Sequence, residues 1–265
     1  MDFRRIEWIF LVVFAAVDIF LGISFYQSQA VDQAVSESTT GEIVADIQRD
    51  QIKLPSLSTK TPTGGYLASQ ANTALYNNRE QLIGQTLSFS KGTLTSSLNS
   101  PIVVKKNHAV ATIKKWLQVS SNVMFGNQYQ YVESLSSSNT YVFCQQIQGH
   151  KIYDKRAQIT VSVSNNKLVS YKQTYIAKMS VLKSNVELTS ARDAVVILYK
   201  DNELANGAKV DWVELAYNYL LDTKGSTVYV PTWFVGVQNQ GAKSVTIKKL
   251  NAITKTVMKD RTNEE

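Results

Sequence analysis

The side chains that most often perform acid–base, metal or redox chemistry are sparse in this chain of 265 residues. Its two histidines, His108 and His150, have no partner at the spacing of metal ligands. The sequence also lacks HExxH, CxxC, a Walker-type glycine loop, a dinucleotide fingerprint and GxSxG, the local signatures of several large enzyme classes. We therefore predict a protein that is not an enzyme and has no metal, no cofactor and no catalytic residue.

Dispersed carboxylates are the remaining route to catalysis. Two carboxyl groups that folding brings roughly 5–9 Å apart could hydrolyse a glycosidic bond. The candidates are Asp154, Glu187, Asp193, Asp211 and Glu214. Acidic side chains are mostly exposed or ion-paired, so we expect a structural role for each of them. A wall-modifying enzyme is therefore the last of the three functions that we consider for this chain.

Cys144 is the single cysteine, so an intramolecular disulfide is excluded. Its neighbours Tyr141, Val142 and Phe143 are typical of a strand, which predicts a packed thiol of low reactivity. A large domain without disulfides is more typical of a bacterial cell surface than of small secreted proteins.

The segment Ile6–Tyr26 is predicted to cross a membrane, because about 1.5 Å per residue gives it a length of roughly 30 Å. Arg4 and Arg5 precede it and the first cation after it is Arg49, which places the N-terminus in the cytoplasm and the rest outside. The alternative to a membrane anchor is a cleaved signal peptide, and Ser28-Gln29-Ala30 would fit its cleavage site. The apolar stretch is longer than the roughly 7–15 residues of a signal peptide, so we predict a retained single-pass anchor in the cell membrane.

Asp18 lies near the middle of the predicted span, where an ionisable side chain costs roughly 2.5–3.5 kcal/mol. Such a residue is expected to face protein, and helical spacing places it on one stripe with Leu11, Ala15 and Gly22. The small side chains of this stripe would allow a second helix to approach closely. The stripe is therefore predicted to bind a partner helix, and the alternative is a protonated Asp18 that the membrane tolerates.

The formal net charge of the chain is +7. A basic domain beside a membrane is attracted to anionic head groups or wall polymers. The predicted topology, not the charge, excludes nucleic acid as a partner.

The predicted fold class is α+β, with a transmembrane helix followed by two related modules, each a helix packed on an antiparallel meander. The predicted parts are a cytoplasmic tail (1–5), the span (6–26), a stalk with a short helix at about 41–53 (27–65), a first module (66–182) and a second module (183–265).

The first module is predicted to contain a helix from Asn107, its cap, to about Gln118. The second has Ser190 and Asp193 at capping-box spacing, before a helix that ends near Gly207. Strands are predicted at 128–135, 140–146, 157–163, 167–176, 213–221 and 227–237, with a last one from about Val245 and a hairpin turn at 164–166.

The order of several short motifs along the chain resembles the YycI (WalI) family. These motifs are Met1–Glu7 with Ile9-Phe10-Leu11, Asp18–Gly22, Gln51–Pro55, Gly65-Tyr66-Leu67, Gly149–Asp154 and Val230–Val235. The second module is similar to a PepSY-like unit, although Lys255 stands where the closing motif Asn251–Lys255 would have glycine.

The resemblance implies two exported α+β modules and no catalytic residues. It also implies a regulator of the WalK/WalR (YycG/YycF) two-component system, which controls cell-wall metabolism in Gram-positive bacteria of low GC content. The implied partners are the WalK sensor histidine kinase and a YycH-like companion protein. The alternative from another class is an extracytoplasmic binding module for a wall polymer or a peptide.

Overall fold

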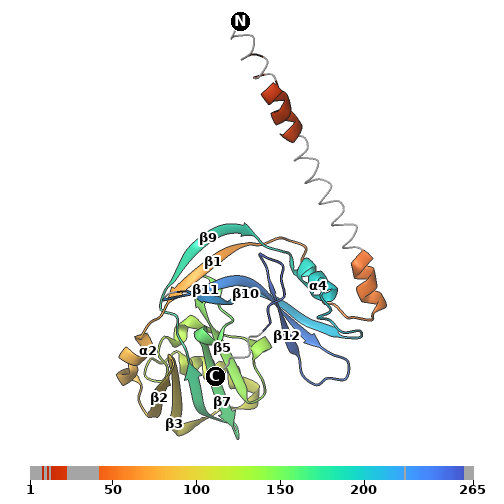
Figure 1. Ribbon diagram of the computed structural model, residues 1–265. Helices are drawn as coiled ribbons and strands as arrows, with labels where there is room; N and C mark the ends of the chain where they lie inside the picture. Colours follow the sequence, from red (N-terminus) through yellow and green to blue (C-terminus); the bar gives the residue numbers. More distant parts are fainter. Residues whose placement is uncertain (1–7, 9–10, 12, 23–41, 224, 260–265) are drawn as a thin grey trace. The chain divides into compact units, whose positions relative to one another are not determined.

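The computed structural model describes residues 8, 11, 13–22, 42–223 and 225–259 (Figure 1). The chain divides into two compact units, residues 1–52 and residues 53–265. The predicted cytoplasmic tail, the possible cleavage motif at 28–30 and the first part of the predicted stalk lie outside the described residues.

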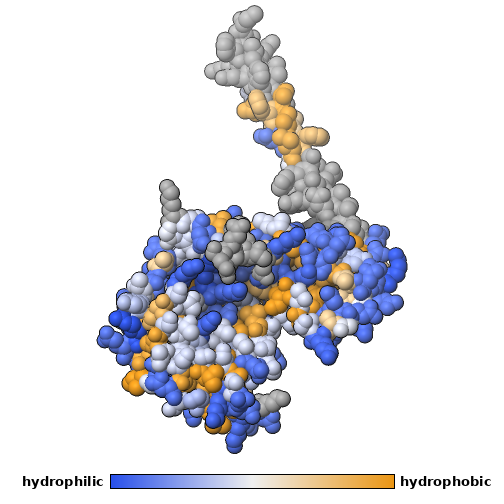
Figure 2. Space-filling view, turned by 60° about the horizontal axis from the view of Figure 1, so that its bottom comes forward, coloured by the Kyte–Doolittle hydropathy of each residue, from blue (hydrophilic) through white to orange (hydrophobic). Residues whose placement is uncertain are grey.

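In the first unit, residues 8, 11 and 13–22 are helical, and so are residues 42–49, which matches the short helix predicted at 41–53. The described residues up to 22 are almost entirely apolar (Figure 2). No helix among the described residues is long and apolar enough to cross a membrane. Residues 6–7, 9–10, 12 and 23–26 of the predicted span lie outside the described part.

The second unit contains two antiparallel sheets, which confirms the mixed α+β class. The first has five strands in the order β10 (Lys209–Thr223), β11 (Ser226–Gln238), β1 (Thr63–Gln70) and β9 (Met179–Glu187), with β12 (Thr246–Asn251) also paired to β11. Figure 1 shows these strands side by side in a strongly curved sheet.

The other sheet has seven strands and is built almost entirely from the chain between β1 and β9. Its order is β2 (Gln85–Ser90), β3 (Thr93–Val103), β8 (Lys167–Gln173), β7 (Gln158–Ser164), β5 (Thr140–Ile147) and β4 (Tyr129–Tyr131), with β6 (His150–Lys151) paired to β5. Short helical turns connect the strands, namely α2 (Ala74–Asn77), η1 (Arg79–Gln81), η2 (Lys106–His108), η3 (Gly126–Gln128), η4 (Glu133–Leu135) and η5 (Lys155–Ala157).

Strand β1 corrects the predicted organisation. The sequence predicts that Thr63–Gly65 belong to the stalk and the following residues to the first module. In the structure, β1 contains these residues and pairs with β9 and β11 in the five-stranded sheet. The predicted boundary at 182/183 falls inside β9. Sequence reasoning named no strand at β1, β2, β3 or β9, because glycine, serine and threonine dilute the alternation of apolar residues there.

The two longer helices are α3 (Ala109–Leu117) and α4 (Ala191–Lys200). The predicted cap of α3 is wrong, because the helix follows His108 and no side chain caps it. The capping box of α4 is confirmed: Ser190 Oγ accepts a hydrogen bond from Asp193 N at 3.1 Å. This helix ends at Lys200 rather than near Gly207, since Asn202 already has a left-handed φ of 57°.

The predicted strand at 128–135 is reduced to three residues of β4, which lies between the turns η3 and η4. The other predicted strands of this sheet correspond to β5, β7 and β8, with ends that differ by a few residues. The hairpin at 164–166 is confirmed, because Asn165 and Asn166 have φ values of 50° and 57°. Two left-handed residues in succession are the requirement of a type I′ turn.

Apolar contacts join the two sheets. Leu67 and Tyr229 of the five-stranded sheet form one buried cluster with Ile152, Ala157 and Ile176. A second cluster brings residues of β5 together with residues of β10 and β11, and its members are Val132, Val142, Cys144, Tyr153, Ala216 and Phe234. A fully buried apolar side chain contributes roughly 1.5–3 kcal/mol, so these clusters hold the sheets together.

Replacing Ser190 with alanine tests the helix start. The change removes the acceptor of the Asp193 amide, and we expect it to lower the free energy of unfolding by about 1 kcal/mol. Urea unfolding of the full chain in detergent, followed by tryptophan fluorescence, measures this. Ser88→Ala, at an exposed position of β2, is the control and should change little; equal effects of the two substitutions would contradict the assignment.

Candidate functional site

The four residues of the predicted partner stripe, Leu11, Ala15, Asp18 and Gly22, all lie in described helical residues and are exposed. The Leu11 side chain is 63% exposed, and a Cβ added to Gly22 would meet no atom within 4 Å. Their spacing of four, three and four residues places them along one side of a helix. Their role in binding a partner stays a prediction.

The carboxylates considered for catalysis form structural contacts, except Glu187, which is exposed at the end of β9. Asp193 belongs to the capping box of α4, and Asp211 forms an ion pair of 2.7 Å with Lys209. Glu214 accepts a hydrogen bond from the Tyr153 hydroxyl at 2.9 Å. Asp154 contacts Arg156. The expectation of a structural role is confirmed for these four.

The histidines also lie apart from one another. His108 precedes α3, and His150 packs edge-on against the Tyr217 ring with centroids 4.9 Å apart. In the part of the chain that the structure describes, no group of three or more His, Cys, Asp or Glu side chains could hold a metal ion.

Cys144 is buried, as the sequence predicted, and its neighbourhood suppresses ionisation. Burial, together with the negative charges of Asp154 and Glu214, raises the pKa of the thiol to about 12. Burial and the adjacent Glu214 also raise the pKa of Tyr153, so its hydroxyl stays a neutral hydrogen-bond donor. Both groups therefore serve packing and hydrogen bonding.

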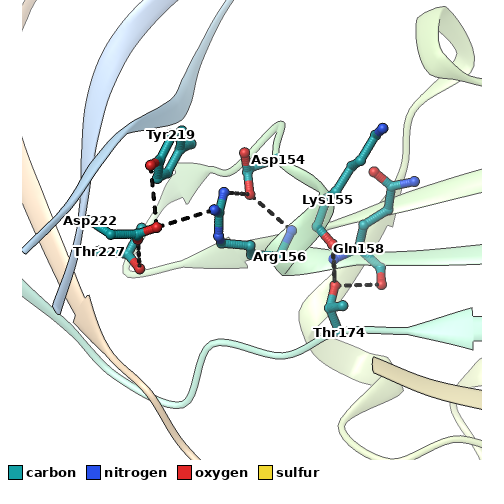
Figure 3. A network of polar contacts seen from close by, with 8 residues as sticks. All are labelled: Asp154, Lys155, Arg156, Gln158, Thr174, Tyr219, Asp222 and Thr227. Atoms are coloured by element: carbon teal, nitrogen blue, oxygen red, sulfur yellow. Dashed lines mark hydrogen bonds and ion pairs between the residues drawn. The ribbon is translucent and has the colours of Figure 1, made fainter. Parts of the chain in front are cut away.

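Arg156 is the centre of a polar network that joins the two sheets (Figure 3). Its guanidinium lies 3.4 Å from Asp154, 3.5 Å from Asp222 and 3.9 Å from the centroid of the Tyr219 ring. Asp222 also accepts hydrogen bonds from the Tyr219 hydroxyl at 3.2 Å and from Thr227 Oγ1 at 2.7 Å. We call these five residues the Arg156 junction.

The turn η5 holds Arg156 in place. Asp154 Oδ1 accepts a hydrogen bond from Arg156 N at 2.9 Å, which caps the turn. Thr174 Oγ1 donates to Lys155 O at 2.6 Å and accepts from Gln158 N at 3.0 Å, which ties the turn to the segment after β8. Because Tyr219, Asp222 and Thr227 belong to β10 and β11 and η5 directly precedes β7, the junction links the five-stranded sheet to the start of a strand of the seven-stranded sheet.

The chemistry of the Arg156 junction is structural. A guanidinium stays protonated and cannot act as a base, and it neutralises the carboxylates beside it. Sequence reasoning missed this group, because Asp154 and Asp222 are far apart in the chain and belong to no motif that predicts their contact. The sequence singles out Asp154 as a candidate carboxylate and as the end of the motif Gly149–Asp154, but neither observation predicts a contact with Arg156 or Asp222.

Fold and site together define an α+β protein with two antiparallel sheets, joined by apolar clusters and a polar junction, after a helical N-terminal segment. Residues 31–253 match the model of the family described as YycI protein. This match covers most of the chain, and the chain belongs to the YycI family.

Two solved structures of low sequence identity match the chain. An uncharacterized protein from Eubacterium rectale ATCC 33656 is 10% identical, with a TM-score of 0.46, over 79% of this chain and 91% of that chain. The C-terminal domain of YpeB from Bacillus megaterium is 11% identical, with a TM-score of 0.38, over 72% of this chain and 96% of that one. No curated protein matches the chain at a significant level.

Arg156→Ala tests the junction. The substitution removes two ion pairs and a cation–π contact that are partly exposed, and we expect a loss of about 1 kcal/mol in the free energy of unfolding. Urea unfolding measures it. Lys155→Ala is a matched control, because the Lys155 amine points away from the network in Figure 3. If both variants unfold at the same urea concentration, the junction does not stabilise the fold.

Thiol labelling tests the burial of Cys144. At pH 8 a thiol with a pKa near 12 is protonated and shielded, so a disulfide reagent should label the native chain only as fast as it opens. In urea the thiol should react at once. Since the pKa of this thiol in the folded chain lies above its ordinary value of 9.0, the free energy of unfolding should also fall as pH rises from 9 toward 12. Complete labelling of the native chain within the dead time would contradict the assignment, and Cys144→Ser gives the blank.

Proposed function

We propose that this chain is a non-enzymatic, membrane-anchored regulator of the essential WalK (YycG) sensor histidine kinase, which controls cell-wall metabolism. The observation that carries the proposal is membership of the YycI family over residues 31–253. The contacts of the described carboxylates and of Cys144 support a role in binding rather than catalysis.

The proposed mechanism is association of the N-terminal helix with helices of the kinase and of a YycH-like companion protein. An ionisable side chain inside a bilayer is stabilised when it faces protein, which favours contact through Asp18. Ala15 and Gly22 on the same side would let the helices pack closely. In this arrangement the N-terminus is cytoplasmic and the chain after Tyr26 lies outside the cytoplasm, as Arg4 and Arg5 before the span favour.

A second candidate function is an extracytoplasmic binding module for a wall polymer or a peptide. The net charge of +7 favours it, because a basic surface attracts anionic polymers. A co-purification from native membranes distinguishes the two candidates, since only the first requires the kinase.

The triple substitution Ala15→Ile, Asp18→Leu, Gly22→Ile tests the helix contact. Asp18→Leu alone should weaken recovery of the kinase several-fold, because hydrogen bonds between membrane helices average about 0.6 kcal/mol and reach about 1.7 kcal/mol. The two isoleucines add a steric barrier, so the triple variant should nearly abolish recovery. Co-precipitation from detergent-solubilised membranes, at matched expression, is the measurement.

Leu21→Ile is the control, because residue 21 is not part of the stripe and the substitution preserves its size and its apolar character. Undiminished recovery of both kinase and companion with the triple variant would place the association in residues 53–265. Loss of recovery with Leu21→Ile as well would show that the helix responds to any change.

A further inference from the structure

Strand β9 is an exposed edge of the five-stranded sheet. Among the described residues it pairs with β1 and with no other strand, so one row of its backbone N–H and C=O groups faces away from the sheet. Residues 180–185 are all exposed, and the side chains of Val181 and Leu182 are 54% and 58% exposed although both are apolar.

The edge is protected at only one end. The pairing of β1 with β9 shifts register around Lys183, and Asn185 has a left-handed φ of 54°. Gly65 makes this bulge possible, because a Cβ there would lie 1.8 Å from the carbonyl oxygen of Lys183. Bulges and charged residues normally keep edge strands from pairing with other chains. The stretch Met179–Val181, before the bulge, has neither.

A groove of about 490 Å³ lies beside this unprotected stretch. Ala68 of β1 is paired with both Ser180 and Val228, so these three side chains share one face of the sheet. They line the groove together with Leu182, Gln70 and Ser226. An added strand would therefore place alternate side chains next to a partly apolar hollow.

The charge at the edge favours an acidic occupant. Lys178 lines the groove and Lys183 lies in the bulge; both are exposed, and neither forms an ion pair with the described residues. A second copy of the chain would bring the same lysines and another net charge of +7, which opposes pairing of like edges.

We propose that β9 is a strand-addition site for an extended, acidic segment of another protein, with apolar and carboxylate side chains in alternation. The segment's backbone pairs with the free row of β9, its carboxylates lie on the groove face beside Lys178 and Lys183, and its apolar side chains lie on the opposite face beside Val181. Main-chain pairing supplies affinity in such complexes and side-chain pockets supply selectivity. This inference does not depend on the kinase.

A labelled synthetic peptide of alternating valine and glutamate is the probe, and its binding to the full chain in detergent is measured by fluorescence anisotropy. We expect saturable binding, with roughly ten-fold weaker binding of a valine–lysine peptide and of an acidic peptide N-methylated at alternate amides. The double variant Lys178→Glu, Lys183→Glu should weaken binding of the acidic peptide by roughly ten-fold and strengthen binding of the valine–lysine peptide.

The matched control is Lys114→Glu, Lys167→Glu, which changes the charge equally at exposed positions away from β9. Equal losses in the two double variants would overturn the proposal, and so would undiminished binding of the N-methylated peptide. Leu182→Asp leaves both lysines in place and should weaken binding of the acidic peptide. If the full chain instead forms dimers that Leu182→Asp dissociates, the occupant is a second copy and the assignment to an acidic partner is wrong.

Discussion

Strand β1 lies between β9 and β11, and its two rows of backbone hydrogen bonds join segments that are far apart in the chain. Leu67 is paired with Val181 on one side and with Tyr229 on the other. The segment between β1 and β9 is long, but the conformational entropy lost when its two ends are brought together grows only slowly with its length. This segment can therefore contain the complete seven-stranded sheet. The positions of β9 and of its groove follow from this pairing.

The contact between the sheets combines two kinds of interaction with different effects. The buried clusters around Leu67 and Phe234 supply most of the stabilisation, because apolar burial contributes more per side chain than an exposed ion pair. The Arg156 junction adds directional contacts, since a planar guanidinium between two carboxylates and an aromatic ring is satisfied in few orientations. Apolar packing holds the sheets together and the junction restricts how they are oriented.

The proposed function, that of a regulator which is not an enzyme, would act through surfaces that bind. The described residues offer two surfaces of contrasting kinds, the apolar stripe with Asp18 and the basic edge at β9. A helix in a bilayer associates by close packing and by satisfying its rare polar groups, whereas an open sheet edge associates through its backbone. The family assignment rests on residues 31–253, which include β9 but not the stripe, and the two surfaces would allow one chain to contact more than one partner.

The sequence by itself determined the features whose causes are local. The Ser190–Asp193 capping box, the Asn165-Asn166 turn and the packed thiol of Cys144 depend on near neighbours, and all three were predicted. The order of short motifs was also sufficient to predict the family. Only the tertiary structure decided that β1 belongs with β9 and β11, that Arg156 meets Asp222, and that the edge at Val181 and Leu182 is open. Strand pairing and charge contacts between distant segments depend on the free energy of the whole fold, and serine-rich or glycine-rich strands carry little local signal of where they pair.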